Sequence, residues 1–160
     1  MLMTRNDLHE SDYRKMVGLL NIRLADAIVL QTQVKQAHWN VKGPHFIGLH
    51  KLFDEISEAM LEYIDMIAER AVQLGGVAEG TAEIAVQRTL IEPYPLDIST
   101  GGAHCEALSA AIATFGTAVR KGIDEADNSA DKDTADLYTE VSRGVDKWLW
   151  FVEAHLQADA

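Results

Sequence analysis

Long stretches with helical periodicity, interrupted at only a few points, constrain this chain more than any other feature of its sequence. Apolar residues recur every three or four positions, as they do on the buried face of an amphipathic helix. Only 3 of the 160 residues are proline, which leaves room for long uninterrupted helices. The periodicity predicts four long helices, over residues 12–41, 46–74, 102–126 and 132–156.

The connections between these stretches differ in length, and the difference bears on topology. Gly43-Pro44 breaks the chain after the first stretch, and Gly75-Gly76 ends the second. The next connection is long and holds a short predicted helix over residues 81–88. Short, long and short connections fit an all-α, ferritin-like four-helix bundle in which the crossover between the second and third helices carries this short helix. Spacing alone leaves other helical bundles open.

The composition describes one acidic, globular domain. We expect the bundle to occupy residues 12–157 after a short N-terminal tail of residues 1–11, with a packed core because 48% of residues are hydrophobic. A net charge of −11 disfavours binding to duplex phosphate and favours the attraction of cations. A single cysteine, Cys105, excludes an internal disulfide and a thiolate metal cage. We find neither a signal-peptide pattern nor a membrane-spanning apolar run, and we expect a cytoplasmic protein.

The second predicted helix carries two polar pairs on the side away from its apolar stripe. Taking Ile56 as the centre of that stripe, the four members of these pairs each lie at least about 120° from it: His50, Asp54, Asp65 and Glu69. His50 and Asp54 are spaced i, i+4, and the other two have the same spacing. Each pair therefore shares one helix face and can reach one ion. Imidazole with carboxylate suits iron or zinc, whereas carboxylates alone suit magnesium or calcium.

The two pairs are too far apart to share an ion within one chain. Asp54 and Asp65 are eleven residues apart, which is about 16 Å along a helix, whereas metal–oxygen bonds are about 2 Å. Two antiparallel copies of this helix across a two-fold axis would bring the first pair of one chain to the second pair of the other, in two equal sites. His38, before the tight turn, would fold back beside His50 and complete a set of two histidines and a carboxylate.

Other interpretations of this acidic stripe stay open. An acidic stripe opposite an apolar one is more often only a solvated helix face, and periodicity alone favours that interpretation. No glutamate in the chain is followed by histidine at the third position. The inward-facing Glu-x-x-His pairs of di-iron bundles are therefore absent, and an iron site, if there is one, lies elsewhere.

Several motifs resemble those of the Dps family. They are the run from Lys35 to Pro44 (KQAHWNVKGP), Phe46-Ile47 with His50, Asp54, Asp65, the run over 68–76 (AERAVQLGG), the run over 94–98 (YPLDI) and the run over 146–151 (DKWLWF). The resemblance covers nearly the whole chain after about residue 15 and is most specific between His38 and Gly76. It implies a ferritin-like fold and a homo-oligomeric shell of twelve subunits.

The resemblance also implies a reaction and the residues that carry it. In this family, ferrous iron (Fe²⁺) is oxidised at two-fold interfaces, preferably by hydrogen peroxide rather than oxygen, and is stored as a ferric (Fe³⁺) mineral, which protects DNA from oxidative damage. The family's metal ligands fall on His38, His50 and Asp54 of one subunit and on Asp65 and Glu69 of its partner. Zinc is a substitute for iron in such a site.

Further positions match the family around this centre. Lys35 and Trp39 match positions close to the metal, and we hypothesise that Trp39 absorbs oxidising equivalents; aromatic packing at the helix end is an equally good interpretation. Acidic residues before and within the last helix match those that line three-fold pores and attract Fe²⁺. Here they are Asp127, Asp131 and Asp136, and each serves equally well as a cap or loop residue.

DNA binding is the part of the family's activity that this sequence supports least. Family members that bind DNA often use lysine-rich tails, and here the last seven residues, 154–160, contain no lysine or arginine. We assign no DNA-contacting residue and expect weak or no binding at neutral pH. Two alternatives remain: a nucleoid-compacting DNA-binding protein with secondary iron binding, located on the nucleoid, and an acidic helical assembly without chemistry.

Overall fold

Four long helices and one short helix make up the part of the chain that the computed structural model describes, residues 2 and 4–157. The helices are α1 (Glu10–Asn40), α2 (Phe46–Gln73), α3 (Ala82–Arg88), α4 (Gly101–Asn128) and α5 (Lys132–Glu153). Their ends lie within three residues of the predicted ones, the largest difference being an earlier end of the last helix. No strand occurs among the described residues, and the prediction of an all-α bundle with a short helix in its long crossover is confirmed.

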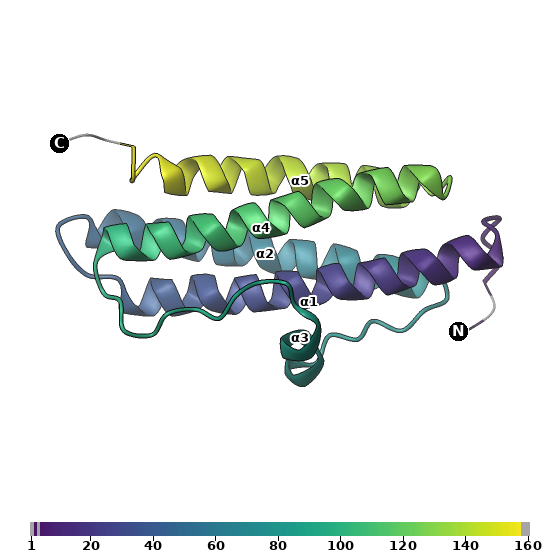
Figure 1. The fold of residues 1–160 in the computed structure, drawn as a ribbon, viewed down its shortest axis with the longest axis horizontal. Coiled ribbons are helices and arrows are strands. Elements are labelled where there is room, and N and C mark those ends of the chain that lie inside the picture. Colours follow the sequence, from purple (N-terminus) through teal and green to yellow (C-terminus); the bar gives the residue numbers. More distant parts are fainter. Residues whose placement is uncertain (1, 3, 158–160) are drawn as a thin grey trace.

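The long helices form two antiparallel hairpins, α1 with α2 and α4 with α5 (Figure 1). α2 and α4 run in the same direction, so the chain must return along the whole bundle between them. The crossover that contains α3 makes this return along the outside of α1, against which α3 packs. This is the short, long and short pattern of connections that the sequence predicts.

The predicted glycine breaks explain where α1 and α2 end, and side-chain caps mark where α3, α4 and α5 begin. Gly43 in the α1–α2 turn has φ +113° and Gly75 after α2 has φ +78°, in the left-handed region that glycine adopts most easily. At the other ends, the side chains of Thr81, Thr100 and Asp131 each accept a hydrogen bond from a backbone N–H in the first turn of the following helix. These bonds satisfy N–H groups that have no partner within the helix.

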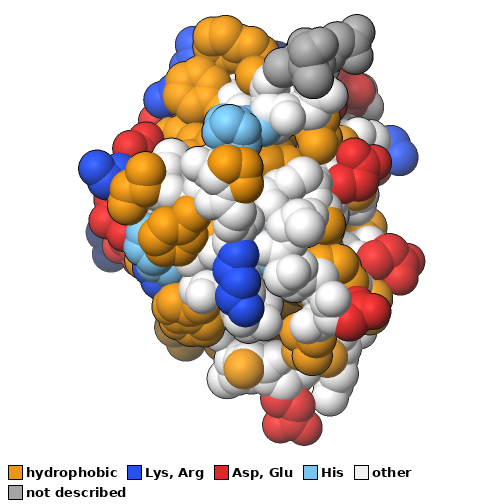
Figure 2. All heavy atoms as spheres, turned by 90° about the vertical axis from the view of Figure 1, so that its left-hand side faces the viewer, with side chains coloured by type: hydrophobic (Ala, Val, Ile, Leu, Met, Phe, Trp, Pro, Cys, Tyr) orange, Lys and Arg blue, Asp and Glu red, His pale blue; other side chains and the backbone are white. Residues whose placement is uncertain are grey.

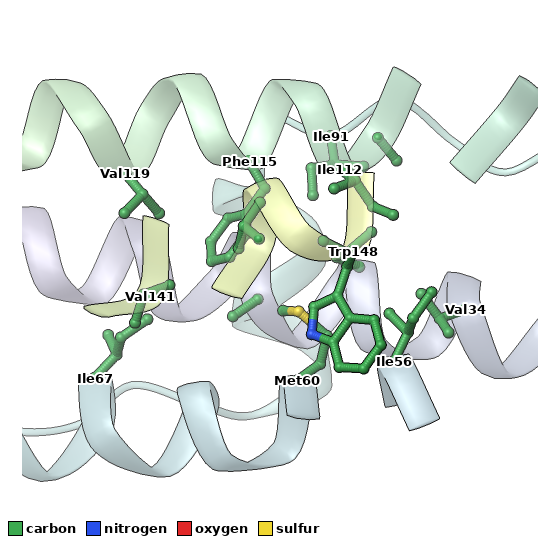
Figure 3. Packing of buried hydrophobic residues seen from close by; sticks show 14 of the residues in the cluster. Val34, Ile56, Met60, Ile67, Ile91, Ile112, Phe115, Val119, Val141 and Trp148 are labelled. Atoms are coloured by element: carbon green, nitrogen blue, oxygen red, sulfur yellow. The ribbon is translucent and has the colours of Figure 1, made fainter. Parts of the chain in front are cut away.

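The apolar core lies between the four long helices. Figure 3 shows Phe115 and Val119 of α4 above Val141 of α5, with the indole of Trp148 reaching towards α2. The predicted apolar stripe of α2 is buried, since five of its members are at most 2% exposed: Leu49, Phe53, Ile56, Met60 and Ile67. Within the described residues, no helix is both long and apolar enough to cross a membrane.

A buried ion pair holds the end of α2 to the start of α5. Arg70 Nη2 donates to Asp131 Oδ1 over 2.7 Å, and Arg70 Nε donates to Thr134 Oγ1 over 2.9 Å. The Asp131 carboxylate also accepts a bond from the backbone N–H of Thr134, at 3.0 Å. Both charged groups are thereby paired and hydrogen-bonded, as burial of charge requires. The turn between α4 and α5 is fixed against the far end of α2.

A second buried carboxylate anchors the crossover to α1. Asp26, 1% exposed, accepts hydrogen bonds from Thr89 Oγ1 at 3.0 Å and from the backbone N–H of Leu90 at 2.7 Å. Arg23 lies 2.9 Å from the same carboxylate, and Gln33 donates to the backbone oxygen of Glu92 at 2.7 Å. These bonds hold the second half of the crossover beside the C-terminal half of α1.

Candidate metal centre

The ends of α1 and α2 bring two histidines together. His38 lies in the last turn of α1 and His50 in the second turn of α2. Nδ1 of His38 is 2.7 Å from the backbone oxygen of His50, and Nδ1 of His50 is 2.9 Å from the backbone oxygen of His38. The rings stack with centroids 3.8 Å apart and planes inclined by 21°. The tight turn thus folds His38 back onto His50, as predicted.

These reciprocal hydrogen bonds decide which nitrogen of each ring is free. A backbone carbonyl oxygen can only accept a hydrogen bond, so each Nδ1 carries the proton and donates it. Nε2 of the neutral ring then holds a lone pair. Metal-binding histidines are oriented in this way, through a hydrogen bond from the other ring nitrogen to a carbonyl or carboxylate. His38 and His50 each have a nitrogen prepared to bind a metal ion.

Asp54 lies one turn beyond His50 and is paired with a lysine. Lys35 Nζ donates a hydrogen bond to Asp54 Oδ1, and Nδ1 of His38 is 3.9 Å from the same oxygen. The bond from Lys35 lowers the pKa of the Asp54 carboxyl below its ordinary value, while burial acts in the opposite direction. The carboxylate is therefore charged at neutral pH, and its side chain is 43% exposed. A cation that binds here has to compete with the Lys35 ammonium.

Asp65 and Glu69 lie farther along α2, and both are exposed. Asp54 and Asp65 are eleven positions apart in uninterrupted helix, so their separation is about 16 Å along the axis. Across residues 2 and 4–157, no three His, Cys, Asp or Glu side chains come close enough together to hold a metal ion. One chain therefore brings His38 and His50 beside Asp54 without completing a site, and leaves the other two carboxylates apart.

A groove runs beside this cluster, between α1 and the second half of the crossover. We call it the crossover groove; its walls include Lys35, Gln36 and Trp39 from α1 and Leu90 and Tyr94 from the crossover. Trp39 is 66% exposed, so packing at the helix end does not cover its indole. Lys35 lines the groove and also bonds Asp54, so it connects the groove with the histidine cluster.

The sequence did not predict one hydrogen-bonded pair of side chains that lies near this cluster. Tyr94 Oη lies 2.6 Å from Nδ1 of His104, which is 1% exposed in the first turn of α4. A signal for burial was present, because His104 precedes the core residues Leu108 and Ala111 by four and seven positions, on one helical face. The spacing of residues along the sequence gives no sign that His104 pairs with a tyrosine of the crossover.

The three acidic residues predicted at a pore differ in exposure. Asp131 is 2% exposed, caps α5, and is the partner of Arg70 described above. Asp127 is exposed and pairs with Lys132 over 2.7 Å, and Asp136 is exposed. Of these three residues, Asp127 and Asp136 present their carboxylates at the surface, and Asp131 does not.

The end of the bundle that carries the histidines is rich in apolar side chains. Figure 2 views this end, where apolar groups cover much of the surface with histidine and lysine among them, and most acidic groups lie towards the edges. Exposed large apolar residues belong to the segments that meet here: Trp39, Phe46, Ile47, Leu96, Trp150 and Leu156. Such a surface is typical of a protein–protein interface.

Comparisons with known proteins agree with the fold described above. The ferritin-like domain family matches residues 17–160. A DNA protection during starvation protein of Agrobacterium fabrum is 43% identical over 154 residues, which cover 96% of this chain and 95% of that protein. Among solved structures, Mycobacterium smegmatis Dps has a TM-score of 0.93 at 30% identity, covering 98% of this chain and 95% of that one. DpsA14 from Streptomyces coelicolor has a TM-score of 0.92 at 32% identity, with coverages of 97% and 92%.

Proposed function

Because this chain belongs to the Dps family of ferritin-like proteins, we propose that it oxidises ferrous iron and stores the ferric product inside a shell of its own copies. Hydrogen peroxide is the preferred oxidant in this proposal, and oxygen the alternative. Consuming iron and peroxide together removes the reactants that form hydroxyl radicals. DNA is thereby protected, in keeping with the name of the Agrobacterium relative.

The observation that carries the proposal is the reciprocal hydrogen bonding of His38 and His50 beside Asp54. It leaves both Nε2 atoms free to bind a metal, next to a charged carboxylate. The cluster is half of a site, because Asp65 and Glu69 lie three helical turns away on α2. A partner subunit with its α2 antiparallel would supply those two carboxylates and would receive this chain's pair in return.

The chemistry follows from this set of ligands. Two ferrous ions give two electrons to one hydrogen peroxide, whose O–O bond breaks; with two protons, the products are two ferric ions and two waters. The histidine nitrogens suit Fe²⁺, and the three carboxylates stabilise Fe³⁺ because hard oxygen ligands favour the higher charge. Zinc suits the same ligands but has no redox chemistry, so it would occupy the site without turnover.

We propose that the apolar end of the bundle is covered by other subunits in a homo-oligomer of twelve. Asp127 and Asp136 would then line pores that attract Fe²⁺ by their negative field, while Asp131 serves as a cap and ion-pair partner. The net charge of −11 per subunit opposes strong binding to duplex DNA at neutral pH. A cytoplasmic location stays a prediction from the sequence.

Stopped-flow absorbance tests the proposed reaction directly. Full-length protein is loaded with Fe²⁺ without oxygen and mixed with peroxide, or separately with oxygen, and ferric absorbance is followed. We expect oxidation faster than in buffer, and a drop of at least about tenfold in His50→Ala, since lost ligand-sphere contacts typically cost that much. His9→Ala, which removes an exposed histidine just before α1 at the opposite end of the bundle, is the control. An unchanged rate in His50→Ala would exclude the assignment.

Removal of Lys35 is expected to tighten metal binding. In Lys35→Met, Asp54 loses its competing ammonium partner, so at neutral pH the dissociation constant for Zn²⁺, measured by calorimetry, should fall severalfold. The effect weakens in acid: without Lys35 the depressed pKa of Asp54 rises towards its ordinary value, so the variant's carboxylate is protonated at a higher pH than in the wild type. Its advantage in affinity should therefore shrink as pH falls towards that pKa.

Lys51→Met provides the control for this change, because Lys51 is an exposed lysine directly after His50 and its removal changes the net charge equally. Its affinity for Zn²⁺ should change much less than that of Lys35→Met. Equal effects of the two substitutions would mean that general charge, rather than the bond to Asp54, controls binding.

A further inference from the structure

The hydrogen-bonded pair of Tyr94 and His104 is not used by the proposed site, and its surroundings are unusual. The two rings are nearly parallel, with centroids 6.0 Å apart and planes inclined by 14°. Tyr94 Oη is 2.6 Å from His104 Nδ1, while His104 Nε2 is buried and forms no hydrogen bond of ordinary geometry with any described residue, although the backbone of Asn40 lies close to the ring. Buried polar atoms normally have a partner, so this one calls for a functional or structural reason.

Burial keeps both members of the pair neutral. It raises the pKa of the Tyr94 phenol far above its ordinary value, and it lowers the pKa of the His104 imidazole. At neutral pH the phenol therefore donates its hydrogen bond to an unprotonated Nδ1. The backbone of Asn40 acts against the lowering at His104, so the site gives some stabilisation to a protonated ring. The imidazole is thus placed to accept the phenol's proton.

The pair lies against the elements that hold the proposed iron ligands. Tyr94 lines the crossover groove together with Lys35 and Trp39, and Lys35 bonds Asp54. His104 faces the backbone of Asn40, the last residue of α1 and only two residues after His38. A tyrosine that loses an electron must also lose its proton, and here the proton acceptor is already in place. The geometry thus places an oxidisable ring and an acceptor for its proton beside the elements that carry the proposed iron ligands.

We propose that Tyr94 donates an electron to the iron site when a peroxide meets only one ferrous ion there, and that His104 takes the phenol proton. This inference rests on the proposed ferroxidase function. One Fe²⁺ and one Tyr94 phenol supply the two electrons that break the peroxide O–O bond. With two protons from solvent, the products are two waters, Fe³⁺, a neutral Tyr94 phenoxyl radical and a protonated His104. Without this second electron, one ferrous ion would reduce peroxide to hydroxyl radical.

Trp39 is the other oxidisable ring beside the groove, and it differs from Tyr94 in its surroundings. In the single subunit its side chain is 66% exposed, and it lies at the end that we propose other subunits cover, so the surroundings of its indole depend on assembly. Tyr94 is half-buried, and its oxygen is covered by the bond to His104. The phenoxyl radical is therefore formed where the protein can hold it until a further reductant arrives.

Electron paramagnetic resonance after rapid freezing tests this inference. Full-length protein is loaded with one Fe²⁺ per subunit without oxygen, mixed with one equivalent of hydrogen peroxide, and frozen at successive times. We expect a tyrosyl signal in the wild type and its loss in Tyr94→Phe. Tyr63→Phe, a change of another partly buried tyrosine, is the matched control and should keep the signal. Persistence of the signal in Tyr94→Phe would overturn the proposal.

The role of His104 can be tested through the g values of the tyrosyl radical, which a purely structural role of this residue would leave unchanged. A hydrogen bond to the phenoxyl oxygen lowers the largest g value of a tyrosyl radical, so His104→Leu should raise this value in high-field spectra. His104→Gln, which can still donate a hydrogen bond, should restore most of the shift. A g value that is the same in all three proteins would remove His104 from the proposal.

Ferric absorbance recorded on the same samples distinguishes a failure of this inference from a failure of the proposed ferroxidase function. Iron oxidation without any tyrosyl signal in the wild type would overturn this inference and leave the ferroxidase function standing. Absence of iron oxidation itself would overturn both. Oxidation with two ferrous ions per subunit should be unchanged in Tyr94→Phe, because the iron then supplies both electrons.

Discussion

Two inactive variants of this protein are expected to regain ferroxidase activity when their subunits are mixed. The first carries His50→Ala and Asp54→Ala, and the second carries Asp65→Ala and Glu69→Ala. Every site in either variant alone lacks two of its five ligands, so oxidation should be at least about 100-fold slower than in the wild type. In a mixed dimer, one of the two symmetric sites receives all of its ligands, and the other keeps only His38.

The mixture is made by unfolding both variants together and refolding them, and the rate is read from ferric absorbance. Random pairing makes half of the dimers mixed, each with one good site of two, so about a quarter of the wild-type activity should return. The same variants refolded separately and then combined are the control and should stay inactive. Normal assembly without recovered activity would show that the two halves do not meet across subunits.

Arg70→Ala is expected to cause the largest loss of stability of any single ion-pair change in this chain. It leaves the Asp131 carboxylate buried without its cation, and removal of one partner from a buried pair typically costs about 3–5 kcal/mol. The side chains of Arg70 and Asp131 are only 8% and 1% exposed, so water cannot replace the lost partner. The loss is measured as the change in free energy of unfolding by denaturant, at one fixed subunit concentration because assembly adds to stability.

A second ion pair of the same length serves as the matched control. Arg120 and Asp146 also lie 2.7 Å apart, but their side chains are 46% and 55% exposed. Exposed pairs contribute only about 0–1 kcal/mol, so Arg120→Ala should change the free energy of unfolding little. Equal losses in the two variants would show that burial does not set the contribution of the Arg70 pair.

Local pattern predicted most of the architecture because the features that decide it are local. A helix of this length repeats its apolar face many times, and glycine at Gly43 and Gly75 marks positions that need a left-handed backbone. The stripe centred on Ile56 is buried as predicted, and His50 lies off it. The length of the crossover indicated the direction of α4, because only a long connection can return along the bundle.

The details of the candidate site depend on contacts between distant segments, which spacing does not encode. The sequence predicted that His38 and His50 would be neighbours, but the hydrogen bonds that select their free nitrogens run between side chains of one helix and carbonyls of the other. The pairing of Tyr94 with His104 depends on how the crossover is anchored. In the same way, the burial of Asp131 depends on Arg70, sixty-one residues earlier.

The spacing between the two polar pairs of α2 determines which genetic changes this protein can tolerate. Eleven residues turn a helix by about 1,100°, only about 20° past three full turns, so Asp54 and Asp65 face the same way. A substitution between them preserves that relation. One inserted or deleted residue would rotate Asp65 by about 100° relative to Asp54, and symmetry would spoil both sites of a dimer at once. We expect this segment to keep its length during divergence even where its residues change.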